Sequence, residues 1–178
     1  MLYFCPVFLR GMVKMKKVIL IMAVSVLVAL ILPLKRTLSI SNHKNILEKV
    51  YSTAALNQGF VISYTHSVNK GRVYDYYRCL NSGRLELYST HFVSYGAGIP
   101  EPYETAEAKF TVKDDGYIIE DLHRVLPCLF MAVGLVAEHS FSAGGNEVFL
   151  KDFFNPQTSI VFEVKRVSIL DYLITKKI

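Results

Sequence analysis

The segment FVISYTHSVNKGRVYDYY, from Phe60 to Tyr77, decides the fold of this chain. Phe60, Ile62 and Tyr64 alternate with other residues in its first part, which is the period of two of a strand whose one face is more deeply buried. A turn signal follows at residues 69–71, because Asn and Gly tolerate the positive φ that tight hairpins need. The segment therefore predicts two antiparallel strands joined by a short turn.

Turn signals of the same kind recur along the rest of the chain, at Asn81-Ser82-Gly83, Asp114-Asp115-Gly116, Ala143-Gly144-Gly145 and Asn155-Pro156. The segments between them predict strands at residues 60–67, 72–80, 84–95, 106–113, 117–122, 129–140, 146–153 and 158–167. This spacing leaves little room for crossover helices. The sequence thus predicts a mostly β fold, an antiparallel β-sandwich or barrel-like domain, over residues 59–178.

An apolar segment precedes this domain. Residues 18–34 read VILIMAVSVLVALILPL and carry no charge. As a helix they would measure roughly 26 Å, close to the bilayer core of about 30 Å. The preceding residues 1–17 hold more cations than the following pair Lys35 and Arg36, which favours a cytoplasmic N-terminus. We therefore expect one N-terminal transmembrane helix at residues 18–34, a linker or short helix at residues 35–58, and the β domain outside.

A cleaved signal peptide is the alternative for the same segment. Met15-Lys16-Lys17 followed by an apolar run makes a normal signal start, and Ser39 and Ser41 offer small residues for a peptidase, although no A-x-A is present. Both interpretations place the domain outside the cytoplasm, in the periplasm or at the cell surface. The anchor interpretation adds membrane lipid as a partner of residues 18–34, with the protein held at the plasma membrane.

The charge distribution argues against nucleic-acid binding. The first 36 residues hold six basic groups and no acid, while the other 142 hold 14 basic and 15 acidic groups. A domain so near neutrality lacks the clustered cations that polyanions require, so we expect no nucleic-acid partner. Cys79 and Cys128 either pair in an oxidising compartment or remain buried thiols, and the sequence leaves both alternatives open.

Sequence motifs of known enzymes are missing from the chain: HExxH, GxSxG, GxxxxGK[ST] and GxGxxG do not occur. The five histidines have no regular ligand spacing. We therefore expect no cofactor and no metal, and we assign no catalytic residue. A second apolar stretch, residues 125–137, is too short to cross a membrane and is expected to be a buried core strand.

Two segments nevertheless carry residue types suited to a site. If the strands around residues 60–67 and 72–80 pair as a hairpin, His66 and Asp75 could approach each other near its open end. Ser67 cannot join His66 at one point, because adjacent residues of a strand face opposite ways. A pair that fixes the hairpin is therefore expected. The rival is a hydrolase or metal-dependent enzyme that uses His66, Asp75 and His91.

The second segment, residues 94–102, combines two glycines with two prolines. It predicts either a sharp corner in the sheet or a loop whose exposed amides contact a ligand. The candidate ligand- or partner-binding residues are Tyr64, His66, Ser67, Asp75, Tyr95, Gly96, Ala97 and Gly98.

Four stretches together resemble a bacterial family of uncharacterised proteins, DUF1850: FVISYTHSV at residues 60–68, VYDYY at 73–77, LEL at 85–87 and YGAGIP at 95–100. The chain departs from the family pattern at Asn69 and Asp75, where the family tends to place Glu. Members are commonly encoded near TRAP-type transporters of the TAXI class, so the resemblance implies a permease subunit as a partner and implies no reaction. We expect a membrane-anchored extracytoplasmic accessory or binding module. The alternatives are an extracytoplasmic hydrolase or metal-dependent enzyme and a structural envelope protein.

Overall fold

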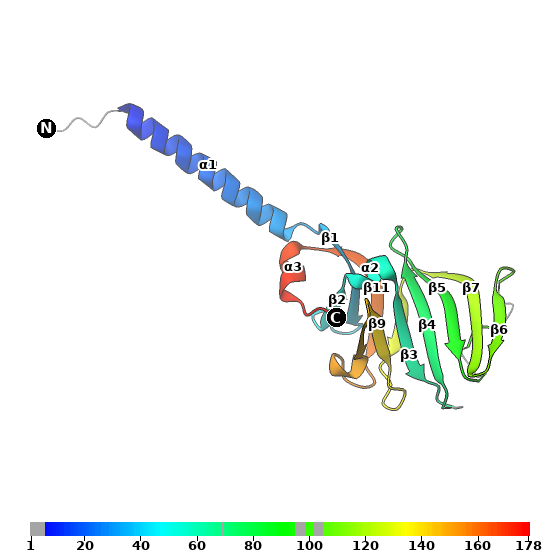
Figure 1. Cartoon of the computed structure of the whole chain (residues 1–178). Coiled ribbons are helices and arrows are strands. Elements are labelled where there is room, and N and C mark those ends of the chain that lie inside the picture. Colours follow the sequence, from blue (N-terminus) through cyan, green and yellow to red (C-terminus); the bar gives the residue numbers. More distant parts are fainter. Residues whose placement is uncertain (1–5, 69, 95–98, 102–104) are drawn as a thin grey trace. The chain divides into compact units, whose positions relative to one another are not determined.

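The computed structural model describes residues 6–68, 70–94, 99–101 and 105–178. The chain divides into two compact units. One contains the long helix α1 (Pro6–Ile31) and the short helix α3 (Ile169–Ile174), and the other contains the β domain (Figure 1).

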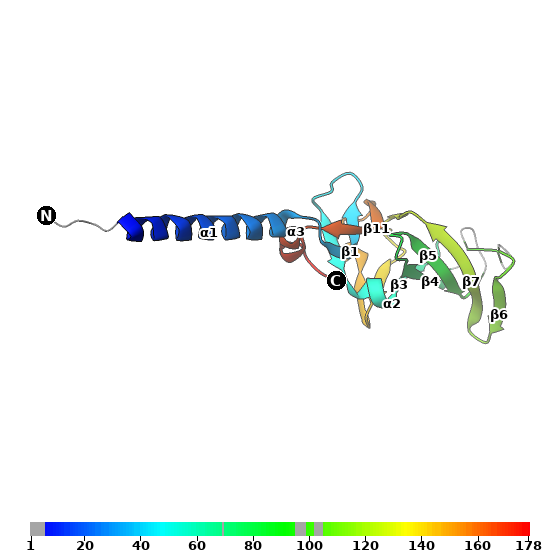
Figure 2. The ribbon, with the colours of Figure 1, turned by 90° about the horizontal axis from the view of Figure 1, so that it is seen from above.

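The β domain consists of two antiparallel sheets. The larger has the strand order β10-β9-β3-β4-β5-β7-β6, and the smaller has the order β2-β1-β11-β8 (Figures 1 and 2). The bounds of the larger sheet's strands are β3 (Phe60–Thr65), β4 (Arg72–Cys79), β5 (Leu85–Phe92), β6 (Lys109–Lys113), β7 (Gly116–Leu126), β9 (Ser140–Ala143) and β10 (Asn146–Phe149). Those of the smaller sheet are β1 (Lys35–Asn42), β2 (Lys49–Ser52), β8 (Leu129–Ala132) and β11 (Ser159–Val167). Helix α2 (Ala54–Gln58) and the 3-10 turn η1 (Leu150–Asp152) complete the domain.

The predicted mostly β, antiparallel architecture is confirmed. The hairpin of β3 and β4 forms as its sequence indicates, with Phe60 opposite Tyr77 and Thr65 opposite Arg72. Within the described residues neither sheet closes on itself, so the barrel alternative is not realised. The domain is two open sheets that share one core.

Aromatic rings join the two sheets. Phe60 of β3 stacks on Tyr77 of β4 with ring centroids 5.1 Å apart, and its ring also lies 6.0 Å from that of Phe162 of β11. Leu38 and Ile40 of β1 are fully buried in the same core. Burial of such side chains is the main favourable term that holds the sheets together.

Residues 35–58, expected to be a linker or short helix, form part of the fold instead. β1 and β2 pair antiparallel, with Ile40 opposite Val50, and only residues 54–58 are helical. The segment was mistaken for a linker or short helix because Ile46, Leu47, Val50 and Leu56 lie at loosely helical spacing. Its polar residues did not suggest burial either, yet Ser39 is fully buried.

The expected transmembrane helix at residues 18–34 is not found. No helix in the part of the chain that the structure describes is long and apolar enough to cross a membrane. α1 ends at Ile31 and β1 begins at Lys35, so the last three residues of the expected segment are not helical. The uncharged helical part, residues 18–31, therefore rises only about 21 Å.

The apolar stretch 125–137 is only partly the buried strand that we expected. Val133 is buried, but Leu135 and Val136 are 66% and 74% exposed. Only the four residues of β8 pair with β11 as a ladder, and the side chains of Leu135 and Val136, beyond Val133, leave the core. Cys79 and Cys128 are both free thiols, and burial raises the pKa of Cys79 to about 11.

The start of β3 yields a stability prediction. Gly59 has φ of 76°, and a Cβ added there would lie 2.5 Å from the carbonyl oxygen of Tyr77. Gly59→Ala should lower the free energy of unfolding by on the order of 3 kcal/mol, because left-handed backbone strain adds to the clash. Urea denaturation measures this loss.

Gly145→Ala is the matched control for that substitution. Its φ is 83°, but no atom lies within 4 Å of the added Cβ, so it should cost only about 1 kcal/mol. Equal losses in the two variants would contradict the close approach of β3 to β4 at Gly59.

Candidate functional site

Strand β4 sends its side chains alternately to the two faces of the larger sheet. Val73 and Tyr77 point inward and are 2% and 5% exposed, whereas Tyr74 is 39% exposed on the outer face. The VYDYY stretch thus contributes to the core and to the surface at once. Two groups of polar residues result, one on each face.

The inner group is centred on Asp75. The hydroxyl of Thr90 donates a hydrogen bond of 2.6 Å to its Oδ1, and the Tyr64 hydroxyl donates a second. Burial raises the pKa of the Asp75 carboxyl to about 6, although both hydrogen bonds act in the opposite direction. Burial of a carboxylate is costly unless donors satisfy it, which is what these two hydroxyls do.

Two tyrosines complete the inner group. Burial and then the nearby Asp75 charge raise the pKa values of Tyr64 and Tyr77 far above their usual range. Both phenols therefore stay protonated, and Tyr64 remains a hydrogen-bond donor to Asp75. The Tyr64 ring also lies 5.5 Å from that of His139, whose pKa burial lowers.

His66 does not sit beside Asp75. Asp75 pairs with Ile62, four residues before His66, which corresponds to roughly 13 Å along the strand. The His66 ring is buried, and its Nδ1 accepts the backbone N–H of Val68 at 3.2 Å, a contact that shapes the β3–β4 turn. Ser67 is exposed in that turn.

The predicted site residues therefore fall into three places. Tyr64 and Asp75 are hydrogen-bonded under the sheet, while His66 and Ser67 belong to the turn at its end. The residues Tyr95, Gly96, Ala97 and Gly98 lie outside the described residues. The His66–Asp75 arrangement that the enzyme alternative required is not formed.

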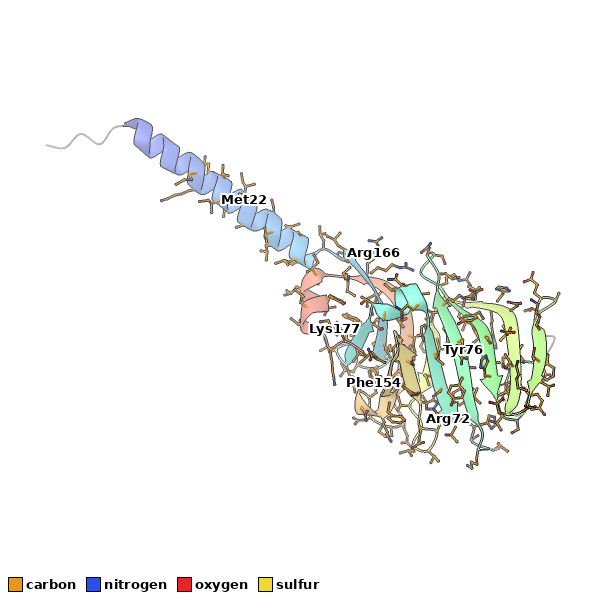
Figure 3. All side chains as sticks on the ribbon, in the orientation of Figure 1. Met22, Arg72, Tyr76, Phe154, Arg166 and Lys177 are labelled. Carbon is orange, nitrogen blue, oxygen red and sulfur yellow. The ribbon has the colours of Figure 1, made fainter. Side chains whose placement is uncertain are left out.

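The outer face of the larger sheet carries a hollow of about 460 Å³, here called the outer hollow. Tyr76 and His91 meet in it with ring centroids 4.5 Å apart, and Arg72 lies over the Tyr74 ring at 5.8 Å. In Figure 3, Tyr76 lies over the middle of the sheet and Arg72 nearer its end. Its lining is Arg72, Tyr74, Tyr76, His91, Phe92, Val93, Lys113, Asp115, Gly116, Tyr117 and Ile118.

The charges of the outer hollow differ in how firmly they are held. The Arg72 guanidinium donates to the hydroxyls of Ser63 and Thr65 and to the carbonyl of Glu138, which fixes it at one edge. Lys113 and Asp115 come from the β6–β7 hairpin. Burial lowers the pKa of His91 against the opposing effect of nearby carboxylates, so its imidazole is neutral at pH 7.

A smaller hollow of about 180 Å³ shares Tyr74 and Tyr76 with the outer hollow. Ser63 and Ser140 lie at its floor with their hydroxyl oxygens 2.7 Å apart, and Ser140 donates to Glu147 at 2.5 Å. The two tyrosines therefore form a ridge between two recesses.

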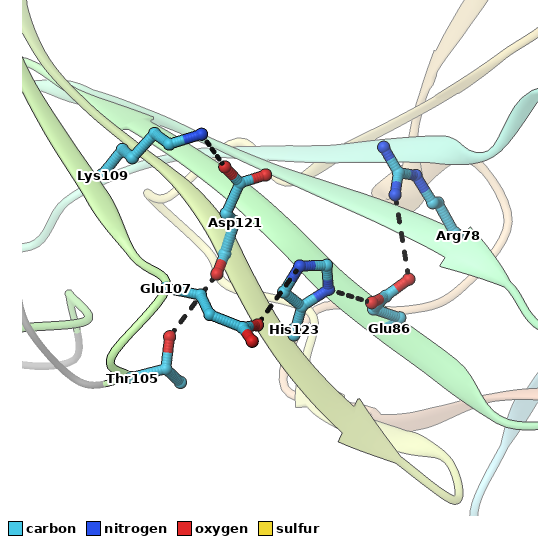
Figure 4. A network of polar contacts seen from close by, with 7 residues as sticks. All are labelled: Arg78, Glu86, Thr105, Glu107, Lys109, Asp121 and His123. Atoms are coloured by element: carbon cyan, nitrogen blue, oxygen red, sulfur yellow. Dashed lines mark hydrogen bonds and ion pairs between the residues drawn. The ribbon is translucent and has the colours of Figure 1, made fainter.

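A second polar network lies further along the outer face (Figure 4). Glu86 Oε1 lies 2.7 Å from His123 Nδ1, and Glu107 Oε2 lies 3.8 Å from His123 Nε2. The hydrogen bond with Glu86 raises the pKa of His123. Asp121 and His123 have φ of 56° and 48°, at a register shift opposite β5. The bulge redirects both side chains toward their partners. Positive φ is uncommon for residues other than glycine, so two such residues close together mark a local departure from regular strand geometry.

Within the described ranges, no three His, Cys, Asp or Glu side chains gather as a metal site would need. The outer hollow instead offers aromatic faces and fixed charge. Such an arrangement can hold a ligand or a protein side chain by stacking and by charge.

These features define an antiparallel β-sheet protein with a polar and aromatic outer face. A family model described as "Domain of unknown function (DUF1850)" matches residues 60–150, about half of the chain, and the chain belongs to this family. No curated protein matches the chain, and no solved structure does. The matched residues begin at the first residue of β3 and include all seven strands of the larger sheet.

Sequence reasoning missed Tyr74, Tyr76 and Arg72 as surface residues. The signal was present, because a strand that buries Val73 and Tyr77 must expose the residues between them. No sequence pattern indicates the network of Glu86 and His123, because a bulge between β5 and β7 determines where His123 points.

Asp75 yields a pH prediction. Its folded-state pKa is raised to about 6, above the value of about 4 expected when unfolded. As pH rises through this interval, the unfolded state loses its proton first, so the stability that the protonated carboxyl contributes is lost. Asp75→Asn should therefore gain stability over the wild type between pH 4 and pH 7, by on the order of 2 to 3 kcal/mol.

Chemical denaturation at several pH values measures this difference. Asp114→Asn, in the exposed β6–β7 turn, is the control and should follow the wild type. Parallel stability profiles for the wild type and Asp75→Asn would show that Asp75 titrates normally.

Proposed function

We propose that this protein is a non-catalytic binding module whose recognition surface is the outer hollow. One observation carries the proposal: Tyr74, Tyr76 and His91 present their rings beside the fixed guanidinium of Arg72. Tyr and Arg are the residues that dominate binding energy at protein interfaces, because they combine large contact area with directional polar groups.

The arrangement of the titratable groups supports binding rather than turnover. The acid with the most unusual pKa, Asp75, is buried on the opposite face from the outer hollow. His91 contacts the Tyr76 ring instead of orienting toward a nucleophile. A general base must reach the proton that it removes, and Asp75 is separated from the hollow by its own strand.

We propose a protein partner, a permease subunit of a TRAP-type transporter of the TAXI class. The resemblance to DUF1850 supports this choice of partner. The size of the hollow suits an inserted side chain or loop, and its two recesses on either side of the tyrosine ridge suit a partner of matching shape.

We also propose that the β domain works outside the cytoplasm and that residues 18–34 contact membrane lipid. The basic N-terminus and the uncharged run support this localisation. The apolar side chains of α1 support the lipid contact, since those of Leu20 and Ile21 are each 64% exposed.

A reporter fusion tests the localisation. An alkaline phosphatase fused after Ile178 should be active, because this enzyme needs an oxidising compartment to form its disulfides. A green fluorescent protein fused at the same residue should give little signal. The reverse pattern would place the domain in the cytoplasm and exclude the proposed localisation.

Partner capture tests the outer hollow. The full chain, purified from detergent-solubilised membranes, should retain a permease subunit, and Tyr74→Ala should weaken that capture roughly 30-fold, as loss of a binding hot spot does. Tyr88→Ala is the matched control. Tyr88 lies on the same face, under Arg78, but does not line the hollow.

Two outcomes would overturn this proposal. Equal capture by the wild type and Tyr74→Ala would remove the hollow from the interface. Capture of no membrane protein by the wild type would favour the structural envelope role.

A further inference from the structure

A third hollow, of about 400 Å³, lies at the end of the β domain where the β4–β5 turn meets β11. Figure 3 labels Arg166 at this end of the domain and Arg72 toward the other. We call it the basic hollow. It is lined by Arg36, Asn81, Ser82, Gly83, Val164, Lys165 and Arg166.

The lining concentrates positive charge. It includes three cationic residues and no acidic residue among the described residues. One of the three is paired, because Lys165 Nζ lies 2.5 Å from Oε1 of Glu163. This concentration stands out, because residues 37–178 as a whole carry 14 basic and 15 acidic groups.

Arg36 is held in place by the fold. Its Nη2 donates a hydrogen bond of 2.6 Å to the carbonyl of Leu80, at the start of the β4–β5 turn. This bond uses one of the five N–H donors of a guanidinium. The turn adds the exposed polar residues Asn81 and Ser82 on the other side of the hollow.

We propose that the basic hollow binds the phosphate of an anionic lipid headgroup. The fixed guanidinium of Arg36, with Arg166 beside it in the lining, matches a phosphate. Charge-assisted hydrogen bonds to phosphate oxygens are strong, and arginine can make two in parallel. The polar turn residues supply neutral donors. The site is distinct from the outer hollow and shares no residue with it.

The choice of a lipid over a free phosphate rests on the chain itself and on the lipid contact proposed above. Arg36 follows the last residue of α1, Ile31, by five positions, and the apolar side chains of α1 are exposed. Lys and Arg residues at the surface of a bilayer that contains anionic lipid are attracted to its headgroups. The helical part of the segment that we propose to contact lipid therefore ends only five residues before Arg36 in the sequence, and the lipid headgroups supply the phosphate.

Vesicle flotation of the full chain tests the proposal. The wild type should bind vesicles of phosphatidylcholine mixed with phosphatidylglycerol more tightly than vesicles of phosphatidylcholine alone. The double variant Lys165→Gln/Arg166→Gln should lose roughly 10- to 30-fold of binding to the mixed vesicles only. Lys44→Gln/Lys151→Gln removes the same charge from exposed positions outside the hollow and should retain the preference.

A second pair of variants keeps the test valid if the double variant folds poorly. Ser82→Glu places a negative charge in the exposed turn of the hollow without removing a described contact. Ser67→Glu adds the same charge to the exposed β3–β4 turn. Only Ser82→Glu should abolish the preference for anionic vesicles.

The results separate the possible sources of phosphate. If Lys44→Gln/Lys151→Gln loses as much binding to the mixed vesicles as Lys165→Gln/Arg166→Gln, net charge alone explains the binding, and the proposal is overturned. A second outcome is that inorganic phosphate stabilises the wild type but not Ser82→Glu against heat, while the wild type shows no preference for anionic vesicles. This outcome would assign the hollow to a soluble phosphate and overturn the lipid source. These vesicle results do not depend on the capture experiment with Tyr74→Ala, because the basic hollow and the outer hollow share no residue.

Discussion

The register between β3 and β4 is the constraint on which the rest of the β domain depends. With Phe60 opposite Tyr77, the rings that pack against Phe162 all face the smaller sheet. A slip of one residue would turn every side chain of one strand to the other face. The buried carboxyl of Asp75 would then meet solvent and the Tyr74 ring would enter the core, so the same pairing defines the core and the outer hollow.

The same alternation that buries Asp75 at a free-energy cost places Tyr74 and Tyr76 on the outer face. Burial of Asp75 opposes its ionisation, and the hydroxyls of Tyr64 and Thr90 reduce the penalty without removing it. The penalty is tolerated because neighbouring residues bury large rings on the same face. β4 therefore displays Tyr74 and Tyr76 outward from a strand whose other face is packed in the core. A preorganised surface of this kind loses less entropy if it binds a partner, as proposed above.

The sequence predicted the features that depend on local pattern. Strands β3 to β7 and β11 lie close to the expected ranges, because alternation and turn residues are read within a few positions. β1 was missed because polar Thr37 and Ser39 are buried in it, which only its neighbours decide. The distance between His66 and Asp75 and the bulge at Asp121 and His123 depend on register across strands, and no local pattern records register.

The strand order of the smaller sheet has a consequence for how the protein folds. β1, the first strand of the chain, lies between β2 and β11, the last strand, while the larger sheet contains the local hairpins β3–β4, β4–β5, β6–β7 and β9–β10. Contacts between distant residues form slowly because a long loop must close first. The larger sheet can assemble as the chain emerges from the ribosome, but β1 must wait with its unpaired edge until Val167 has been made. Synthesis thus leaves an interval in which this edge is open to chaperones or to pairing with another chain.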